Sequence, residues 1–157
     1  MSVFELPKKP TAENELYERD FYSWTLQQAE LLREGRLNEL DIANIAEEIE
    51  GLARTEFRSL VSALRVLMLH MLKWDSQPEK RSRSWLASIS EQRDVFSDVL
   101  SDSPGLKPRF TEALQRAYTQ ARRAAAAETG LKIEAFPGEC PYSMQDLTAR
   151  PFNIDPK

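Results

Sequence analysis

The sequence predicts an all-α protein: an antiparallel bundle of four to five main helices with a short C-terminal helical turn. Three observations lead to this prediction. Apolar residues recur every three or four positions over long stretches, as one buried face of a helix requires. The 157 residues contain only five glycines and no run of alternating apolar residues, which argues against strands. The helical stretches are separated by short connections, and these favour antiparallel neighbours.

The first expected helix carries an apolar stripe from Tyr17 and ends at Gly35, a natural left-handed terminator. A second helix begins near Asp41, whose carboxylate can cap it. Gly51 leaves open whether that helix ends there or continues. Both helices are expected to face the core along these stripes: Tyr17, Phe21, Trp24, Gln28 and Leu31 in the first, and Ile42, Ile45, Ile49 and Leu52 in the second.

The third and central helix is expected over residues 55–74, and Pro78 closes this segment. Ser82 or Ser84 can cap a fourth helix. The stripes of these two helices are Phe57, Leu60, Leu64, Leu67, Met71 and Trp74 in the third, and Trp85, Ile89, Gln92, Phe96 and Val99 in the fourth.

A fifth helix is expected from about Pro108 to Gly130, and its alanine-rich second half allows a neighbouring helix to approach closely. Ser143 followed by Asp146 indicates a short capped turn. We therefore expect an irregular N-terminal arm at 1–14, a single helical-bundle domain at 15–150 and a tail at 151–157.

Composition excludes several classes of protein. A net charge of -4 argues against non-specific coating of DNA, which needs a broad cationic surface. A single cysteine excludes an internal disulfide. No stretch reaches the roughly 18 apolar residues of a membrane span, and the N-terminus lacks the apolar core of a secretory signal. We expect a soluble cytoplasmic protein without membrane contact.

Polar residues interrupt the apolar seams, and they are the first candidate site. Gln28, Gln92 and Glu128 lie on or beside seams, His70 lies in the most apolar helix, and Glu48 flanks the second stripe. If these side chains meet, they form a polar layer of the kind that holds a metal or fixes register. The alternative, which we favour, is that each is solvated or hydrogen-bonded singly.

The metal chemistry of such a layer is restricted by its ligands. One histidine and no Glu-x-x-His motif exclude a di-metal carboxylate bundle. A mononuclear site of His70 with Glu48 or Glu128 stays open on ligand type, although we expect no cofactor. Cys140 activated by His70 carries little weight as a nucleophile. No phosphate-binding glycine loop is present.

The second candidate site is a basic corner between two tryptophans. Arg81 and Arg83 lie between Trp74 and Trp85, and arginines with aromatic rings can stack on bases or hold phosphates. The same residues fit helix-end anchors with arginines stacked on the rings, which is the interpretation we favour. The corner also contrasts in charge with the acidic segment 39–56, which suits a complementary surface for a partner or for self-association.

Six runs of residues carry a resemblance to a known family. They are Y-E-R-D-F-Y-S-W-T at 17–25, A-E-E-I-E at 46–50, L-H-M-L-K-W at 69–74, Q-P-E-K-R-S-R-S-W at 77–85, A-A-A-E-T-G-L at 125–131 and F-P-G-E-C-P-Y at 136–142. The chain resembles the bacterial family called domain of unknown function 29 over about 17–147. The resemblance implies a small, soluble all-helical protein, and it implies no activity and no catalytic residue.

Three functional hypotheses follow. The leading one is a non-enzymatic helical protein that binds an unknown protein partner or forms a homo-oligomer through the surface between its acidic and basic segments. It predicts that His70→Gln leaves binding intact, whereas reversal of Arg81 and Arg83 to Glu abolishes it. The second is a metal- or ligand-binding bundle, possibly an enzyme, that uses His70 with Glu48 or Glu128. The third is nucleic-acid contact through the basic corner, which the net charge disfavours.

Overall fold

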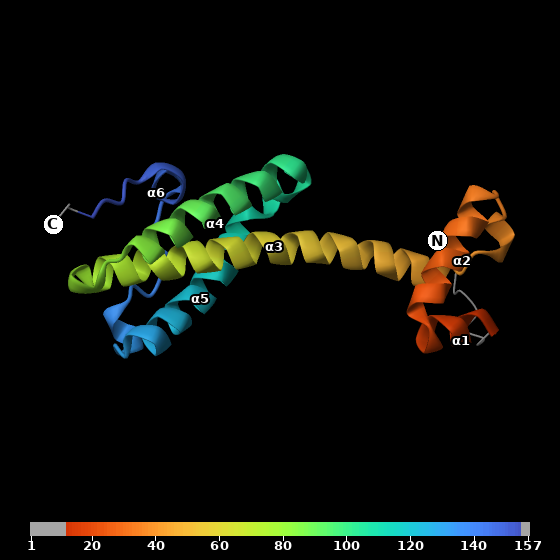
Figure 1. Ribbon diagram of the computed structural model, residues 1–157, viewed down its shortest axis with the longest axis horizontal. Helices are drawn as coiled ribbons and strands as arrows, with labels where there is room; N and C mark the ends of the chain where they lie inside the picture. The colour runs from red at the N-terminus through yellow and green to blue at the C-terminus, as the bar shows by residue number, and fades with distance from the viewer. Residues whose placement is uncertain (1–11, 155–157) are drawn as a thin grey trace, which may run out of the picture. The chain divides into compact units, whose positions relative to one another are not determined.

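The computed structural model describes residues 12–154, and these divide into two compact units with a boundary after Ala53. Every regular element among the described residues is helical, as the sequence predicts (Figure 1). The first unit holds α1 (Ala12–Arg19), α2 (Phe21–Arg33), η1 (Leu37–Glu39) and the beginning of α3 (Ile42–Ser76). The second unit holds the rest of α3, η2 (Pro78–Lys80), α4 (Arg83–Asp102), η3 (Pro104–Arg109), α5 (Phe110–Thr129), η4 (Ile133–Ala135) and α6 (Met144–Ala149).

The N-terminal stripe forms two helices, and our prediction of a single helix from Tyr17 is wrong. The chain breaks at Asp20, which lies outside helical geometry with φ -150° and whose Oδ1 accepts a hydrogen bond from the Ser23 backbone N–H at 2.9 Å. An aspartate in this position caps a new helix because it satisfies one of the first free N–H groups. α1 already begins at Ala12, within the stretch where we expected an irregular arm, and residues 1–11 of that arm lie outside the described residues.

Helix α3 runs without interruption through Gly51 for 35 residues. Asp41 caps its start by accepting a hydrogen bond from the Asn44 backbone N–H at 3.3 Å, as the sequence predicts. The second and third expected helices are therefore one helix. Its buried side chains all lie between Phe57 and Trp74, and they include the whole predicted central stripe.

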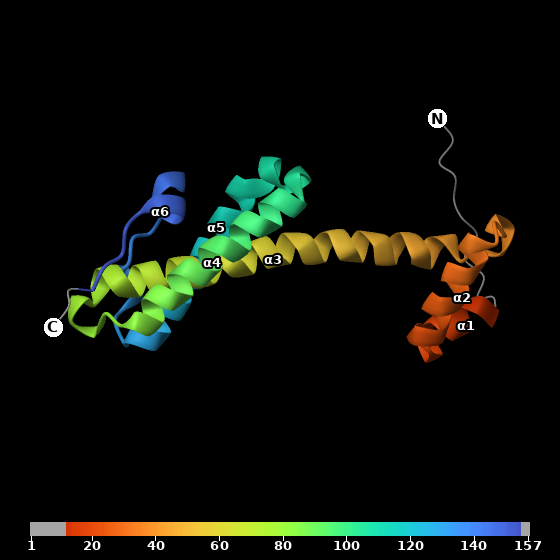
Figure 2. The same ribbon diagram turned by 45° about the horizontal axis from the view of Figure 1, so that its top comes forward.

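The core of the second unit is built on this apolar part of α3. Helix α4 returns along α3 and α5 reverses again, so that successive helices are antiparallel (Figures 1 and 2). The α5 face toward the core is lined by alanines without exposed surface. The core side chains that α4 and α5 supply are Ile89, Phe96, Ala113, Ala117, Tyr118, Ala121 and Ala125.

The C-terminal segment packs on this bundle through Phe136, Tyr142 and Leu147, which are all buried. Helix α5 ends at Gly130, whose φ of 73° is left-handed and suits glycine at a helix C-terminus. Helix α6 starts with a complete capping box between Ser143 and Asp146, so the predicted capped turn is confirmed. Among the described residues, no helix combines the length and the hydropathy that a membrane crossing needs.

Candidate functional site

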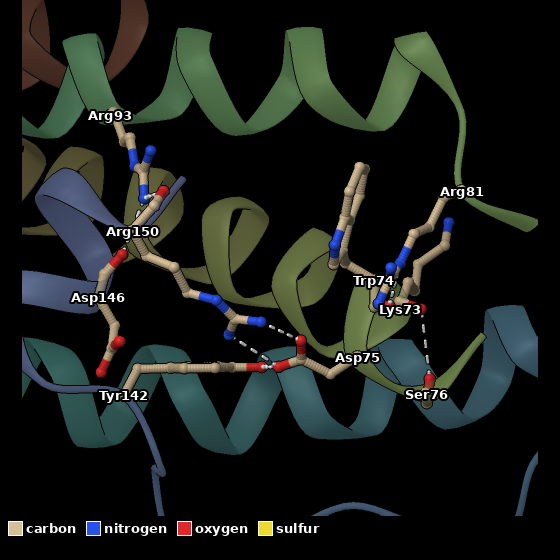
Figure 3. A network of polar contacts seen from close by, with 9 residues as sticks. All are labelled: Lys73, Trp74, Asp75, Ser76, Arg81, Arg93, Tyr142, Asp146 and Arg150. Atoms are coloured by element: carbon tan, nitrogen blue, oxygen red, sulfur yellow. Dashed lines mark hydrogen bonds and ion pairs between the residues drawn. The ribbon is translucent and has the colours of Figure 1, made fainter. Parts of the chain in front are cut away.

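A connected polar cluster surrounds Asp75, near the end of α3 (Figure 3). Tyr142 donates its hydroxyl hydrogen to Asp75 Oδ2 at 3.0 Å, and Arg150 donates from both terminal nitrogens to the two carboxylate oxygens. The two donors lie on either side of α6, far from Asp75 in sequence. The cluster therefore attaches the C-terminal segment to the end of the longest helix.

Arg93 of α4 holds the same segment from another side. Its guanidinium donates to the backbone carbonyls of Asp146, Leu147 and Arg150 at 2.7–2.8 Å. These carbonyls lie at the C-terminal end of α6, where a helix lacks internal partners for its last C=O groups. Burial and the neighbouring charge of Arg150 lower the pKa of Arg93. Charge-assisted hydrogen bonds to three carbonyls offset that burial.

A pocket of about 350 Å³ opens beside Asp75. Its polar groups already contact one another, because Asp75 binds both Tyr142 and Arg150. Burial, followed by the negative charge of Asp75, raises the pKa of Tyr142 well above its ordinary value, so its hydroxyl stays protonated. The pocket thus holds the ion pair of Asp75 with Arg150 and the neutral phenol of Tyr142. The lining residues are Leu72, Asp75, Ser76, Ala135, Phe136, Pro137, Pro141, Tyr142, Asp146 and Arg150.

The predicted basic corner lies next to this cluster, and part of it is bound within the unit. Arg81 donates to the Trp74 backbone carbonyl at 3.0 Å, and its guanidinium lies 4.9 Å from the Trp74 ring centre. Trp74 is only 4% exposed, and its ring lies 5.4 Å from the ring of Phe152 in a T-shaped arrangement. Trp85 is half-buried, whereas Arg83 is exposed in the first turn of α4. A buried Trp74 offers no face for a base to stack on.

Each residue of the predicted His70 site has a partner of its own. His70 Nδ1 lies 2.8 Å from the Val66 carbonyl, and because a carbonyl only accepts, Nδ1 carries the hydrogen. Glu128 pairs with Lys73 at 2.6 Å, while the Lys73 ammonium also lies 4.8 Å from the Trp85 ring centre.

Glu48 belongs to the first unit, and there it accepts the Tyr17 hydroxyl at 2.5 Å, which raises the pKa of Tyr17 to about 12. The hypothesis that Glu48 shares a site with His70 or Glu128 stays a prediction. Among residues that the structure describes, no group of three or more His, Cys, Asp or Glu side chains could hold a metal ion.

The two predicted seam glutamines differ in their surroundings. Gln28 is 3% exposed, and its Oε1 accepts a hydrogen bond from the Asp41 backbone N–H at 2.9 Å. Asp41 in turn accepts from the indole N–H of Trp24 at 3.2 Å, so Gln28 helps join α2 to the start of α3. The Gln28 Nε2 has no hydrogen-bond partner. Gln92 is half-buried on α4.

A second candidate site is an exposed apolar surface that the sequence led us to place in the core. Ile42, Ile49 and Leu52 are 65%, 61% and 69% exposed, so our expectation that they are core residues is wrong. Ala46 and Ala53 are exposed beside them. We call these five residues of α3 the α3 apolar face. Four of them, at 42, 46, 49 and 53, follow the spacing of four, three and four that places side chains in one line along a helix.

The rest of the first unit also exposes large apolar residues. Phe21, Tyr22, Leu26 and Leu32 of α2 and Leu37 of η1 are also large apolar residues with at least 48% of their surface exposed. Scattered apolar residues are ordinary on a protein surface, whereas a contiguous group marks an interaction site. The periodicity of the sequence carries the signal for Ile42, Ile49 and Leu52, but it does not say what covers them.

Comparison with known proteins gives a family and no activity. Residues 16–153 match the family model described as "Domain of unknown function DUF29", which confirms the resemblance found in the sequence. No curated protein and no solved structure shows a significant match to the chain.

Proposed function

We propose that this chain, which belongs to the DUF29 family, is a non-enzymatic protein that binds another protein through the α3 apolar face. The observation that carries the proposal is the exposure of Ile42, Ile49 and Leu52, each above 60%, on one stretch of helix. Covering an aliphatic side chain of this size contributes about 1.5–3 kcal/mol. Covering three such side chains therefore contributes favourably to holding a partner helix.

The small core of the first unit supports the same proposal. Within the part of this unit that the structure describes, only Trp24, Gln28 and Leu31 are buried. A segment of about 40 residues rarely builds a sufficient core by itself and usually gains stability from a disulfide, a metal or association. The single cysteine of the chain, Cys140, lies in the second unit. Association with a partner is a source of stability that fits this small described core.

The polar pocket of the second unit favours a structural role over catalysis. Asp75 is bound by Arg150 and Tyr142, and Arg93 is bound to three carbonyls of the C-terminal segment. Catalytic groups usually keep an acid, base or nucleophile available for substrate. Here the charged groups satisfy one another and hold the chain together.

The proposal moves the interface away from the predicted basic corner. Arg81 lies over the buried ring of Trp74 and binds its carbonyl, so reversing its charge would disturb the unit itself. Loss of partner binding after that change would not locate an interface. The α3 apolar face offers side chains that can be replaced with less effect on the chain's own contacts.

Site-specific photo-crosslinking in the native host tests the proposal. A photoreactive amino acid replaces Ile49 in one variant and Val95, an exposed apolar residue of α4, in the matched control. We expect a crosslinked protein from position 49 that is absent from position 95. That protein is then identified by mass spectrometry, purified, and titrated against the wild type and Ile49→Asp. Binding at least about tenfold weaker in the variant supports the proposal, and unchanged affinity contradicts it.

A further inference from the structure

The charges around the α3 apolar face indicate which kind of partner fits it. Residues 37–53 contain five acidic residues and no lysine or arginine. One of the acidic residues, Glu50, follows Ile49 by one residue and so lies beside the apolar line, whereas Glu47 lies on the side of the helix toward Tyr17. The face is therefore an aliphatic strip on a strongly acidic part of the chain.

We propose that the partner segment is a basic amphipathic helix that lays its apolar side along this face. This inference rests on the proposed function and adds the chemical class of the partner. Residues 42–53 span three turns, about 17 Å at a rise of about 1.5 Å per residue, which matches one apolar stripe of a short helix. Lysines or arginines beside that stripe would be attracted by the excess of carboxylates in the first unit.

A second copy of this chain fits the same face less well. The described residues of the first unit, 12–53, carry eleven acidic and three basic residues. Two such faces in contact would bring carboxylates together around a mostly apolar contact, and like charges at an interface oppose association. A basic helix removes this repulsion and is attracted before contact, which raises the rate of association at low salt.

The size of the neighbouring side chains also favours a helix as the occupant. Ala46 and Ala53 alternate with Ile42 and Ile49 along the line, so that small side chains lie between large ones. Alternation of this kind provides gaps into which the side chains of a second helix can pack. An extended peptide gains less here, because the face has no sheet edge to supply backbone hydrogen bonds.

Peptide titrations with the full chain test the inference. The probes are two fluorescent 18-residue peptides that share one leucine stripe, the first with lysines and the second with glutamates at all other positions. We expect the Leu/Lys peptide to bind at least about tenfold more tightly than the Leu/Glu peptide, with affinity that falls as salt rises. Fluorescence anisotropy measures both.

Two pairs of variants locate the binding. Ile49→Asp should weaken binding of the Leu/Lys peptide by at least about tenfold, whereas Val95→Asp should leave its affinity unchanged. Glu47→Gln with Glu50→Gln should weaken it severalfold, whereas Glu91→Gln with Asp94→Asn, an exposed acidic pair of equal spacing on α4, should not. If Ile49→Asp loses helical circular dichroism, Ile42→Ala with Ile49→Ala replaces it.

The outcomes separate the inference from the proposed function. If both peptides bind equally well and Ile49→Asp weakens both, the face binds helices but the basic class is wrong. A Leu/Lys affinity that Ile49→Asp leaves unchanged overturns the inference and counts against the α3 apolar face itself. Sedimentation equilibrium gives the remaining test, since a wild-type dimer that Ile49→Asp dissociates would make a second copy the occupant and overturn the inference.

Discussion

Asp75 is the residue through which the C-terminal segment is joined to α3. It accepts hydrogen bonds from Tyr142 and from both terminal nitrogens of Arg150. The ion pair is partly exposed, with 31% of the Arg150 side chain and 37% of the Asp75 side chain accessible, so solvent weakens it. Its two-point geometry nevertheless makes it stronger than a typical surface pair.

We expect Asp75→Asn to lower the free energy of unfolding by about 1 kcal/mol, because it removes the ion pair but leaves an oxygen for the Tyr142 hydroxyl. Asp98→Asn, an exposed change on α4, is the matched control and should cost less than about 0.5 kcal/mol. Urea denaturation followed by circular dichroism measures both. Equal stability of the two variants would show that the Asp75–Arg150 pair contributes nothing.

The phenol of Tyr142 makes stability depend on pH in the alkaline range. Burial, then the charge of Asp75, raises its pKa in the folded state above the ordinary value of 10.0. The folded state therefore holds this proton more tightly than the unfolded state does. Its contribution is fully present below the unfolded pKa and is lost as pH rises above it.

The stability advantage of the wild type over Tyr142→Phe should consequently shrink between pH 9 and pH 11. Phenylalanine keeps the ring packing but has no proton to lose, so the difference between the two proteins isolates the hydroxyl. The raised pKa of Cys140, which burial causes, acts in both proteins and cancels from the comparison. A constant difference up to pH 11 would contradict the assignment.

Single residues show where sequence reasoning about the candidate site succeeds and where it ends. The stripe pattern places Gln28 on a buried seam, and the residue is 3% exposed. The pattern does not reveal that Asp41 is its partner, because that contact depends on how α2 meets α3. Asp75 and Arg150 are 75 residues apart and both lie outside any apolar stripe, so periodicity gives no reason to pair them.

At the scale of elements, α6 depends on contacts made by other helices. It has only six residues, too few for a stable helix in isolation. Its start has its own capping box, whereas its end relies on Arg93 of α4. The hydrogen bonds from the Arg93 guanidinium to three backbone carbonyls connect α4 to the C-terminal segment.

Arg93→Met should loosen α6 while the rest of the second unit stays folded. Each charge-assisted hydrogen bond contributes about 1.5–3 kcal/mol, and methionine keeps part of the packing. We expect amide hydrogen exchange over 144–150 to accelerate at least about tenfold. Arg122→Met, which removes the contact from α5 to the Phe136 carbonyl, should instead affect the segment near 136. Acceleration throughout the second unit would mean that Arg93 supports the whole bundle.

The elements themselves are largely predictable, and the errors have local causes. Apolar spacing and the signals at Asp41, Ser82, Gly130 and Ser143 place the main helices correctly. The break at Asp20 was missed because an apolar stripe can continue across two successive helices. Gly51 does not decide whether the helix ends there, because a single glycine destabilises a helix by only about 1 kcal/mol. The neighbouring turns can offset that cost.

At the scale of the whole molecule, one helix passes through two units that differ in how much they bury. All the buried side chains of α3 lie from Phe57 onward, and its first turns carry the α3 apolar face. The sequence predicts both halves as core, because periodicity records that a face is apolar and not which chain covers it. This is why the fold class followed from the sequence, whereas the exposure of the α3 apolar face became visible only in the structure.

This difference within α3 leads to a prediction for the free protein. Opening the turns at 42–53 exposes little new apolar surface, whereas opening those at 57–72 disrupts the core of the second unit. Local opening free energies follow the buried contacts that are lost, and each 1.4 kcal/mol changes exchange about tenfold. Amides at 42–53 should therefore exchange at least about 100-fold faster than amides at 57–72, measured by hydrogen exchange with mass spectrometry.

Addition of the Leu/Lys peptide, or of a partner identified by crosslinking, should reverse part of this difference. Binding that covers Ile42 and Ile49 stabilises the turns that carry them and leaves the buried turns unchanged, because a ligand stabilises only the state that it binds. Slower exchange confined to the first unit is thus expected, and it should be absent in Ile49→Asp. Uniform exchange along α3 in the free protein would show that the helix behaves as one cooperative unit, and its first turns would then need no partner for stability.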